Sequence, residues 1–138
     1  MSSARETVES MYAAFGAKDE AALRSVLHPD VQWNQCDGMP GGARRRGVES
    51  VIDGVLRKLN STWNDFRVEI ERFVSDAESD SEGDGGTVVV LGAYSGTHGT
   101  TQKPMRAVFA HVYEVNDRRI VRFDQIADTA VMVAAATN

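Results

Sequence analysis

The sequence predicts an α+β fold in which helices pack on one face of a curved, mainly antiparallel sheet. The first part of the chain holds three stretches with apolar residues at helical spacing, and the second part holds four consecutive stretches rich in β-strand formers. Helices followed by a run of strands favour this arrangement over an alternating βα fold. We expect the element order α-α-β-α-β-β-β-β-α, with residues 1–138 forming a single domain.

The N-terminal part predicts two helices. Ser3 forms a capping box with Glu6, which predicts a helix that continues to Ala17. Asp19 caps a second, short helix. This helix should end at His28, because the residue before a proline avoids the helical region.

The next part predicts a strand, a loop and a third helix. Residues 30–35 form the strand, with Val31, Trp33 and Gln35 on one face. Residues 37–47 contain glycines and a proline without periodicity, which indicates a loop. The third helix has regular apolar positions at Val48, Val51, Ile52, Val55, Leu56 and Leu59.

The rest of the chain predicts four strands and a closing helix. Residues 63–75 and 87–97 form the first two strands, and the acidic segment 76–86 between them predicts a solvated turn. This segment is not a calcium loop, because Ser81 and Thr87 stand where an EF-hand needs Gly and Glu. Two further strands flank residues 116–118, and Asp128 can cap the last helix, which runs through Ala136.

The hairpin at residues 116–118 holds the best functional lead. A three-residue loop would pair Val115 with Arg119. That register sets His111 opposite Phe123 and makes Gln125 a diagonal neighbour of His111, about 6–8 Å away. Two polar side chains then lie inside an otherwise apolar wall.

Composition limits the classes of partner. A net charge of −5 without a basic stripe argues against nucleic acid. The single Cys36 excludes an internal disulfide, and one thiol with three scattered histidines gives no zinc spacing, so we predict neither metal nor cofactor. No apolar run approaches ~18 residues and the start lacks a signal-peptide core, which predicts a cytoplasmic protein with no membrane partner.

Two long stretches carry a family resemblance. They are YAAFGAKDEAALRSVLHPDVQW near the start and FAHVYEVNDRRIVRFDQIADTA near the end. Both resemble the SnoaL-like proteins, which share a cone-shaped fold with nuclear transport factor 2 and ketosteroid isomerase. The resemblance implies a curved sheet that wraps around helices to form a cone with an internal pocket.

The catalytic residues of these relatives carry over only in part. SnoaL-like cyclases transfer protons with a His on the fourth strand and an Asp on the fifth; His111 matches the His, and Gln125 stands where the Asp would be. The base, the Tyr and the oxyanion Asp of ketosteroid isomerases fall near Gln35, near Met11 and on His111, so none is kept. The Asp-Arg-Asp set of limonene epoxide hydrolases has no match, because the stretch VVVLGAYSG has no charged residue. Asp37 is the one carboxylate that could replace the missing base.

Two interpretations of His111 stay open. It could act as a general acid or base, with Gln125 orienting the imidazole or holding a substrate oxygen. It could instead be a core histidine satisfied by Gln125 and a backbone carbonyl. The residues expected to bind a ligand are Met11, Phe15, Trp33, Gln35, Phe109, Tyr113 and Phe123.

We therefore expect a cofactor-free protein that binds a small, mostly apolar ligand with a carbonyl group. An isomerase or a polyketide-cyclase-like lyase would fit, and the alternative is a non-catalytic binding or dimerisation module. Residues 44–46 form an arginine triplet, which indicates either a solvated loop or a positive pocket mouth that attracts an acidic substrate. Relatives commonly pair through the sheet face opposite the pocket, which predicts a homodimer that buries Val108, Ala110, Val112 and Ile126.

Overall fold

The computed structural model describes residues 3–76 and 85–138. Its helices are α1 (Ala4–Gly16), α2 (Glu20–Val26), α3 (Val48–Val51), α4 (Lys58–Thr62) and α5 (Thr129–Ala136), with a π-helical segment at Ile52–Arg57 between α3 and α4. Its strands are β1 (Leu27–Asn34), β2 (Arg44–Arg46), β3 (Trp63–Ser75), β4 (Gly86–His98), β5 (Pro104–Asn116) and β6 (Arg119–Ala127). The expected order is confirmed, with β2 as an addition.

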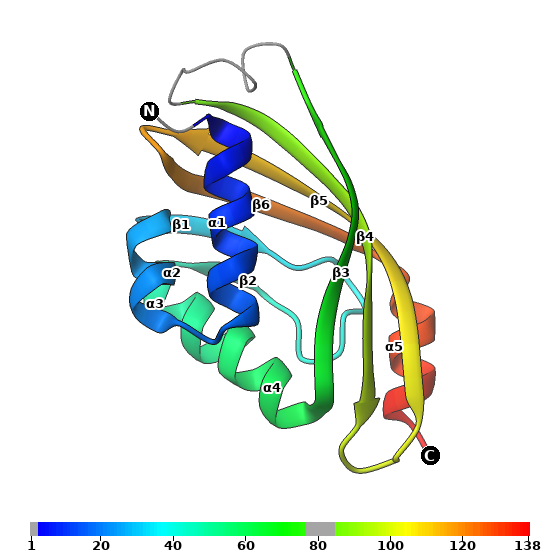
Figure 1. Ribbon diagram of the computed structural model, residues 1–138. Helices are drawn as coiled ribbons and strands as arrows, with labels where there is room; N and C mark the ends of the chain where they lie inside the picture. Colours follow the sequence, from blue (N-terminus) through cyan, green and yellow to red (C-terminus); the bar gives the residue numbers. More distant parts are fainter. Residues whose placement is uncertain (1–2, 77–84) are drawn as a thin grey trace.

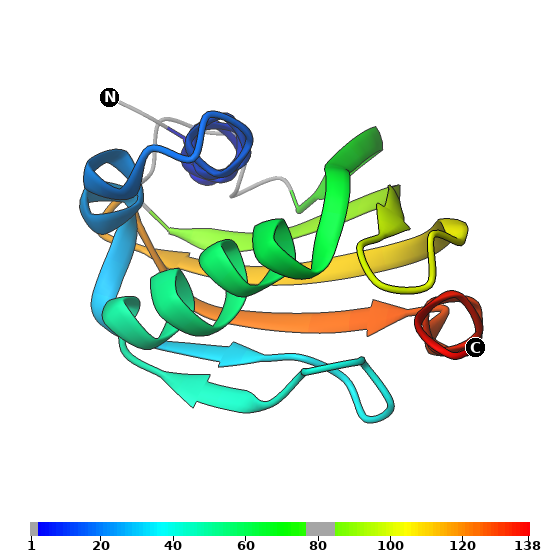
Figure 2. The ribbon, with the colours of Figure 1, turned by 90° about the horizontal axis from the view of Figure 1, so that it is seen from below.

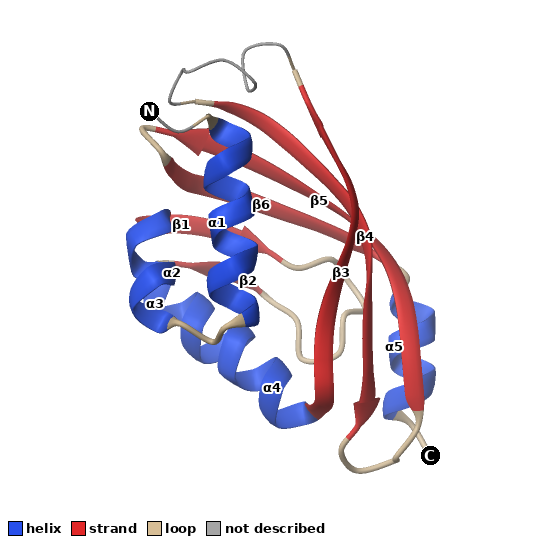
Figure 3. Cartoon of the chain, viewed as in Figure 1, coloured by secondary structure: helices blue, strands red, loops and turns tan. Residues whose placement is uncertain are grey.

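The strands form one curved, mixed sheet in the order β2-β1-β6-β5-β4-β3. Its neighbouring strands are antiparallel except β1 and β6, which run parallel. Helices α1 to α4 lie on the concave side, and α5 packs against β5 away from α1 (Figures 1 and 3). Seen from below, the sheet curves around the α3–α4 helices, which gives the α+β cone predicted from the sequence (Figure 2).

The helix starts are those that the capping residues predict. The Ser3 hydroxyl accepts a hydrogen bond from the backbone N–H of Glu6, and the Glu6 carboxylate accepts one from the backbone N–H of Ser3. At the starts of α2 and α5, the Asp19 and Asp128 side chains accept from the backbone N–H groups of Ala22 and Val131. One boundary was wrong: β1 begins at Leu27, before the proline rather than after it.

The segment predicted as a loop contains strand β2, which is a correction. Residues 44–46 pair with β1 in antiparallel register, with Arg45 opposite Trp33. Three identical residues carry no alternation, so the sequence gives no strand signal here. In the sheet Arg45 is half-buried, whereas Arg44 and Arg46 are exposed.

The hairpin register also differs from the predicted one. Asn116 pairs with Arg119, so the loop has two residues, both at positive φ as in a type I′ turn. A bulge follows, because Val115 pairs with Ile120 but Glu114 pairs with Arg122. Together these shift the pairing by two residues, which keeps His111, Phe123 and Gln125 on their predicted face. At the bulge, Ile120 is buried in place of Val121, which was predicted on that face.

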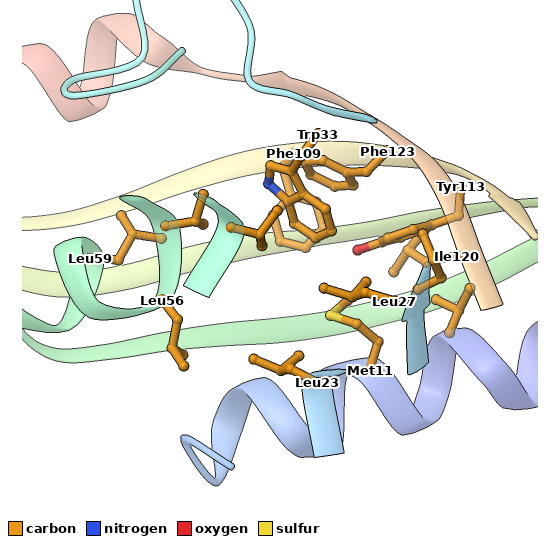
Figure 4. Close-up of a cluster of buried hydrophobic side chains, with 14 of the residues drawn as sticks. Met11, Leu23, Leu27, Trp33, Leu56, Leu59, Phe109, Tyr113, Ile120 and Phe123 are labelled. Carbon is orange, nitrogen blue, oxygen red and sulfur yellow. The ribbon is translucent and has the colours of Figure 1, made fainter. Parts of the chain in front are cut away.

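The apolar core fills the space between the helices and the concave face of the sheet. Figure 4 shows part of it, including Met11, Leu23, Leu27, Trp33, Leu56, Leu59, Phe109, Tyr113, Ile120 and Phe123, all of which are buried. No helix in the described part of the chain combines the length and apolar character needed to cross a membrane. Most of the acidic segment predicted as a turn lies outside the described residues.

Candidate functional site

A small cavity lies between α1, the α3–α4 helices and the concave face of the sheet. Its free volume is about 30 Å³, enough for one or two water molecules. The residues around it are Met11, Tyr12, Phe15, Trp33, Gln35, Val55, Leu59, Phe66, Val68, Tyr94, His111, Tyr113, Phe123 and Gln125. Of the site residues predicted from the sequence, only Phe109 is absent from this wall.

His111 is held by two tyrosine hydroxyls. The Tyr12 hydroxyl lies 2.6 Å from Nδ1 and the Tyr94 hydroxyl lies 2.5 Å from Nε2. The Tyr113 hydroxyl makes a longer contact with Nδ1, at 3.4 Å. Phe109 stacks on the imidazole at a centroid distance of 3.8 Å, which places it behind His111. His111 is 4% exposed. In the described part of the chain, neither Gln125 nor a backbone carbonyl is a hydrogen-bond partner of its imidazole.

Gln125 is linked to His111 through hydrogen bonds to the Tyr94 hydroxyl. The two residues are directly opposite each other on β6 and β5, and the side-chain amide of Gln125 donates to the Tyr94 hydroxyl at 2.8 Å. Its carbonyl oxygen accepts from the backbone N–H of Cys36 at 3.1 Å. Because a backbone N–H can only donate, this contact fixes which end of the amide faces Tyr94.

A third tyrosine extends the chain of hydrogen bonds. The Tyr113 hydroxyl donates to the Tyr12 hydroxyl at 2.8 Å. We call Tyr113, Tyr12, His111 and Tyr94, in this order, the tyrosine–histidine network. It runs along the cavity wall and joins α1 to strands β4 and β5.

Burial keeps every group of this network neutral near pH 7. Desolvation lowers the pKa of His111 well below its ordinary value of 6.5. The same cause raises the pKa of Tyr12, Tyr94 and Tyr113 far above the ordinary value of 10.0. The network therefore consists of neutral groups and carries no charge near pH 7.

The network carries one hydrogen more than its own bonds use. Three hydroxyls and one neutral imidazole bring one hydrogen each, and three short bonds join them. The longer contact of Tyr113 with Nδ1 needs no further hydrogen, because the one hydrogen of Tyr113 is donated to Tyr12. Tyr94 also accepts from Gln125, whose amide supplies its own hydrogen. One hydroxyl hydrogen is therefore left over, and it can be donated into the cavity.

Two further donors face the same cavity. The indole N–H of Trp33 is buried and has no hydrogen-bond partner among the described residues, and Trp33 as a whole is only 4% exposed. In Figure 4 its nitrogen lies on the side of the ring nearer the helix that carries Leu59. Gln35 uses its side-chain carbonyl to accept from Ala43, which leaves its amide N–H groups without a partner in residues 3–76 and 85–138. The polar groups available to a ligand are thus mainly donors.

A larger groove adjoins the cavity between α1 and β3. Its volume is about 560 Å³, and it shares Tyr12, Phe15, Phe66 and Val68 with the cavity wall. A ligand larger than water can extend into this groove. Asp37, considered above as a substitute base, is exposed and lines a polar groove beside Arg44, which shares Gln35 and Gln125 with the cavity wall.

Sequence reasoning missed Tyr12 and Tyr94 as functional candidates. Tyr12 was counted among the apolar positions of the first helix, and Tyr94 belongs to the stretch dismissed for its lack of charge. A signal was present, because a buried tyrosine hydroxyl needs a hydrogen-bond partner. In the described part of the chain, no group of three His, Cys, Asp or Glu side chains is arranged to hold a metal ion.

Comparison with known proteins places the chain in a family. The sequence profile of the SnoaL-like domain matches residues 8–123, which is most of the chain. The protein belongs to the SnoaL-like family. The match begins at Val8, within α1, and covers all the residues of the tyrosine–histidine network.

Solved structures of similar SnoaL-like and related proteins support the fold. An NTF2-like protein from Burkholderia thailandensis is 29% identical, with a TM-score of 0.88 and full coverage (100%) of both chains. An NTF2-like protein of unknown function from Burkholderia pseudomallei is 28% identical, with a TM-score of 0.82 and the same 100% coverage. IdmH from Streptomyces antibioticus, described as a polyketide cyclase, has 22% identity, a TM-score of 0.73 and 96% coverage of each chain. A search of curated proteins found no match.

Proposed function

We propose that this SnoaL-like protein binds a small, mostly apolar ligand with a carbonyl oxygen and transfers a proton next to that carbonyl. The cavity wall is aromatic and aliphatic apart from the network, Trp33 and Gln35. Such a wall favours an apolar ligand body with few polar atoms. An isomerisation or an aldol cyclisation would fit, and neither needs a cofactor.

The spare hydroxyl hydrogen is the observation that carries this proposal. A carbonyl oxygen only accepts hydrogen bonds, so it complements a wall whose available polar groups donate. A buried donor without a partner costs about 1–3 kcal/mol, and the Trp33 indole N–H is such a donor. A ligand oxygen that accepts from these groups removes that cost.

A related structure agrees with a small-molecule ligand. TerC, which has a TM-score of 0.78 and 23% identity to this chain, was co-crystallised with polyporic acid. At this sequence identity the similarity to TerC supports the fold alone. The ligand class proposed for this chain is inferred from the residues of its own cavity.

Thermal shift with matched ligands tests the proposal. Fused-ring ketones of increasing size, beginning with 2-tetralone, are each compared with the hydrocarbon that lacks the oxygen, beginning with tetralin. We expect the ketones to raise the melting temperature and the hydrocarbons to raise it less. Equal shifts within each pair would contradict carbonyl recognition, and no shift for any compound would contradict ligand binding.

The small volume of the cavity favours a second candidate function, a non-catalytic module. A free volume of about 30 Å³ holds water but no fused-ring ketone, and both nitrogens of His111 are satisfied. In this case the network only stabilises the core. The two candidates differ in the ketone experiment, because a closed core gives no difference between a ketone and its hydrocarbon.

A further inference from the structure

We propose that Tyr12, His111 and Tyr94 form a neutral proton relay that delivers a hydrogen to a ligand oxygen at one end while taking a proton from a ligand carbon at the other. This deepens the proposed function and rests on it for the ligand. The proposal depends on three features: the order of the hydrogen bonds, the one surplus hydrogen, and the presence of both Tyr12 and Tyr94 in the cavity wall.

The network has two hydrogen-bonded states that satisfy the imidazole equally. In the first, Nδ1–H of His111 donates to Tyr12 and the Tyr94 hydroxyl donates to Nε2, so the spare hydrogen is on Tyr12. In the second, the Tyr12 hydroxyl donates to Nδ1 and Nε2–H donates to Tyr94, so the spare hydrogen is on Tyr94. The states differ only in the tautomer of the imidazole and the directions of two hydrogen bonds.

Tyr113 and Gln125 give Tyr12 and Tyr94, the two ends of the relay, matching sets of hydrogen bonds. In the first state the Tyr12 oxygen accepts from Tyr113 and from His111. In the second state the Tyr94 oxygen accepts from Gln125 and from His111. Each oxygen thus accepts two hydrogen bonds when its own hydrogen is free for a ligand. Gln125, fixed by Cys36, is a positioning residue in this scheme.

One passage along the relay converts a bound ketone to its enol. Tyr12 gives its spare hydrogen to the carbonyl oxygen and takes the Nδ1 proton, while Nε2 takes the hydrogen of Tyr94. Tyr94 then takes a proton from the carbon beside the carbonyl. The electron pair of that C–H bond forms the C=C bond, and the π pair of the C=O bond forms the new O–H bond.

The relay ends this passage in its second state. No group has gained a charge, and the only net change in the protein is the tautomer of His111. Return of a proton from Tyr94 to a different carbon of the conjugated ligand runs the relay backward and restores the first state. The sum of the two passages is an isomerisation in which the protein is regenerated.

The ¹⁵N NMR spectrum of His111 in the ligand-free protein tests the two states directly. A ring nitrogen that carries hydrogen and one that lacks it have widely separated shifts, and His111→Gln identifies the signals of this residue among the three histidines. At pH 7 we expect both nitrogens at intermediate shifts, or two sets of signals, because both tautomers are populated. A spectrum in which one nitrogen always carries the hydrogen and the other never does would overturn the relay.

Deuterium incorporation into 2-tetralone in D₂O tests the chemistry. We expect exchange faster than in buffer, with a loss of about 10²-fold in Tyr12→Phe and in Tyr94→Phe. Thr7→Val is the matched control, because it removes a buried hydroxyl of α1 that lies outside the cavity wall. A Tyr94→Phe protein that exchanges the ketone as fast as the unaltered protein would overturn the relay, and so would exchange no faster than in buffer.

The two proposals fail in different ways. If ketones give no thermal shift while His111 shows both tautomers, the ligand assignment is wrong and the two hydrogen-bonded states remain. If ketones bind while His111 shows a single tautomer, carbonyl binding remains and the relay is wrong.

Discussion

At the scale of single residues, burial without a charged partner decides the behaviour of His111. Each of its nitrogens meets a tyrosine hydroxyl, and Phe109 covers one ring face at a centroid distance of 3.8 Å. None of these neighbours carries a negative charge to offset the desolvation of an imidazolium, so the folded protein holds the neutral form. Protonation of His111 therefore acts against folding.

The first prediction is an acid-sensitive stability that His111 causes. Because its pKa is lowered in the folded state, the unfolded chain binds the extra proton first, and stability falls as the pH drops below about 6.5. Between pH 7.5 and 5.5 one such group removes about 1.4 kcal/mol from the free energy of unfolding. Urea melts of the unaltered protein and of His111→Gln measure this, and the same loss in both proteins would contradict it.

A second residue-scale constraint is Gly92 on β4. It faces Phe109 of β5, and a Cβ placed on it would lie 2.2 Å from the backbone oxygen of Glu69 and 2.8 Å from the Phe109 ring. The glycine thus allows β3 to approach closely and makes room for the ring that stacks on His111. The backbone oxygen cannot move aside as a flexible side chain could.

The second prediction follows from that contact. Gly92→Ala should destabilise the protein by about 1–3 kcal/mol, because a buried methyl group overpacks the site. Gly16→Ala is the control, since a Cβ at Gly16 meets no atom within 4 Å. Chemical denaturation of both variants provides the comparison, and a Gly92→Ala protein as stable as Gly16→Ala would refute the prediction.

At the scale of elements, strand β2 gives its three arginines different roles. Arg45 lies across Gly54 of the π-helical segment and donates to the backbone oxygen of Gly41 at 3.3 Å. Arg44 and Arg46 are exposed on this edge strand, where charged side chains discourage pairing with another sheet. Arg44 lines the polar groove that contains Asp37 and that shares Gln35 and Gln125 with the cavity wall.

The third prediction separates Arg45 from its neighbour. Arg45→Ala should cost about 1 kcal/mol, because the half-buried Arg45 side chain covers Gly54, whereas Arg44→Ala should stay within about 0.5 kcal/mol of the unaltered protein. Arg45→Met keeps a long side chain over Gly54 and should recover most of the loss. Thermal melts of the three variants test this, and equal effects of Arg44→Ala and Arg45→Ala would count against it.

At the scale of the whole molecule, the sheet face opposite the cavity carries exposed apolar residues. Val108 is 56% exposed and Ile126 is 64% exposed, and with Ala110 they line a shallow depression of about 450 Å³. These residues belong to the strip expected to pair two copies. Contiguous exposed apolar surface of this kind favours association.

The fourth prediction is a homodimer through this strip. Sedimentation velocity at micromolar concentration should show a dimer, and Ile126→Lys should shift it to monomer by placing a charge in the interface. Ile70→Lys is the control, because Ile70 is 40% exposed but lines the groove between α1 and β3. A monomeric unaltered protein would exclude the dimer.

Local patterns in the sequence determined most of the fold. Capping residues set the starts of α1, α2 and α5, and alternation placed β3 at its observed bounds of Trp63–Ser75. The same alternation placed His111 and Gln125 on the inner face, because a strand's period of two depends only on neighbouring residues. These features depend only on residues that are close in the sequence, so the sequence alone is enough to predict them.

Contacts between distant residues determined the rest. The bulge that sets His111 opposite Gln125 is a property of two paired strands, and β2 exists because β1 has a free edge. The partners of His111 come from α1 and β4, 99 and 17 residues away in the chain. Spacing cannot show that three tyrosine hydroxyls converge on one imidazole, because each pair of contacts depends on how the helix lies on the curved sheet.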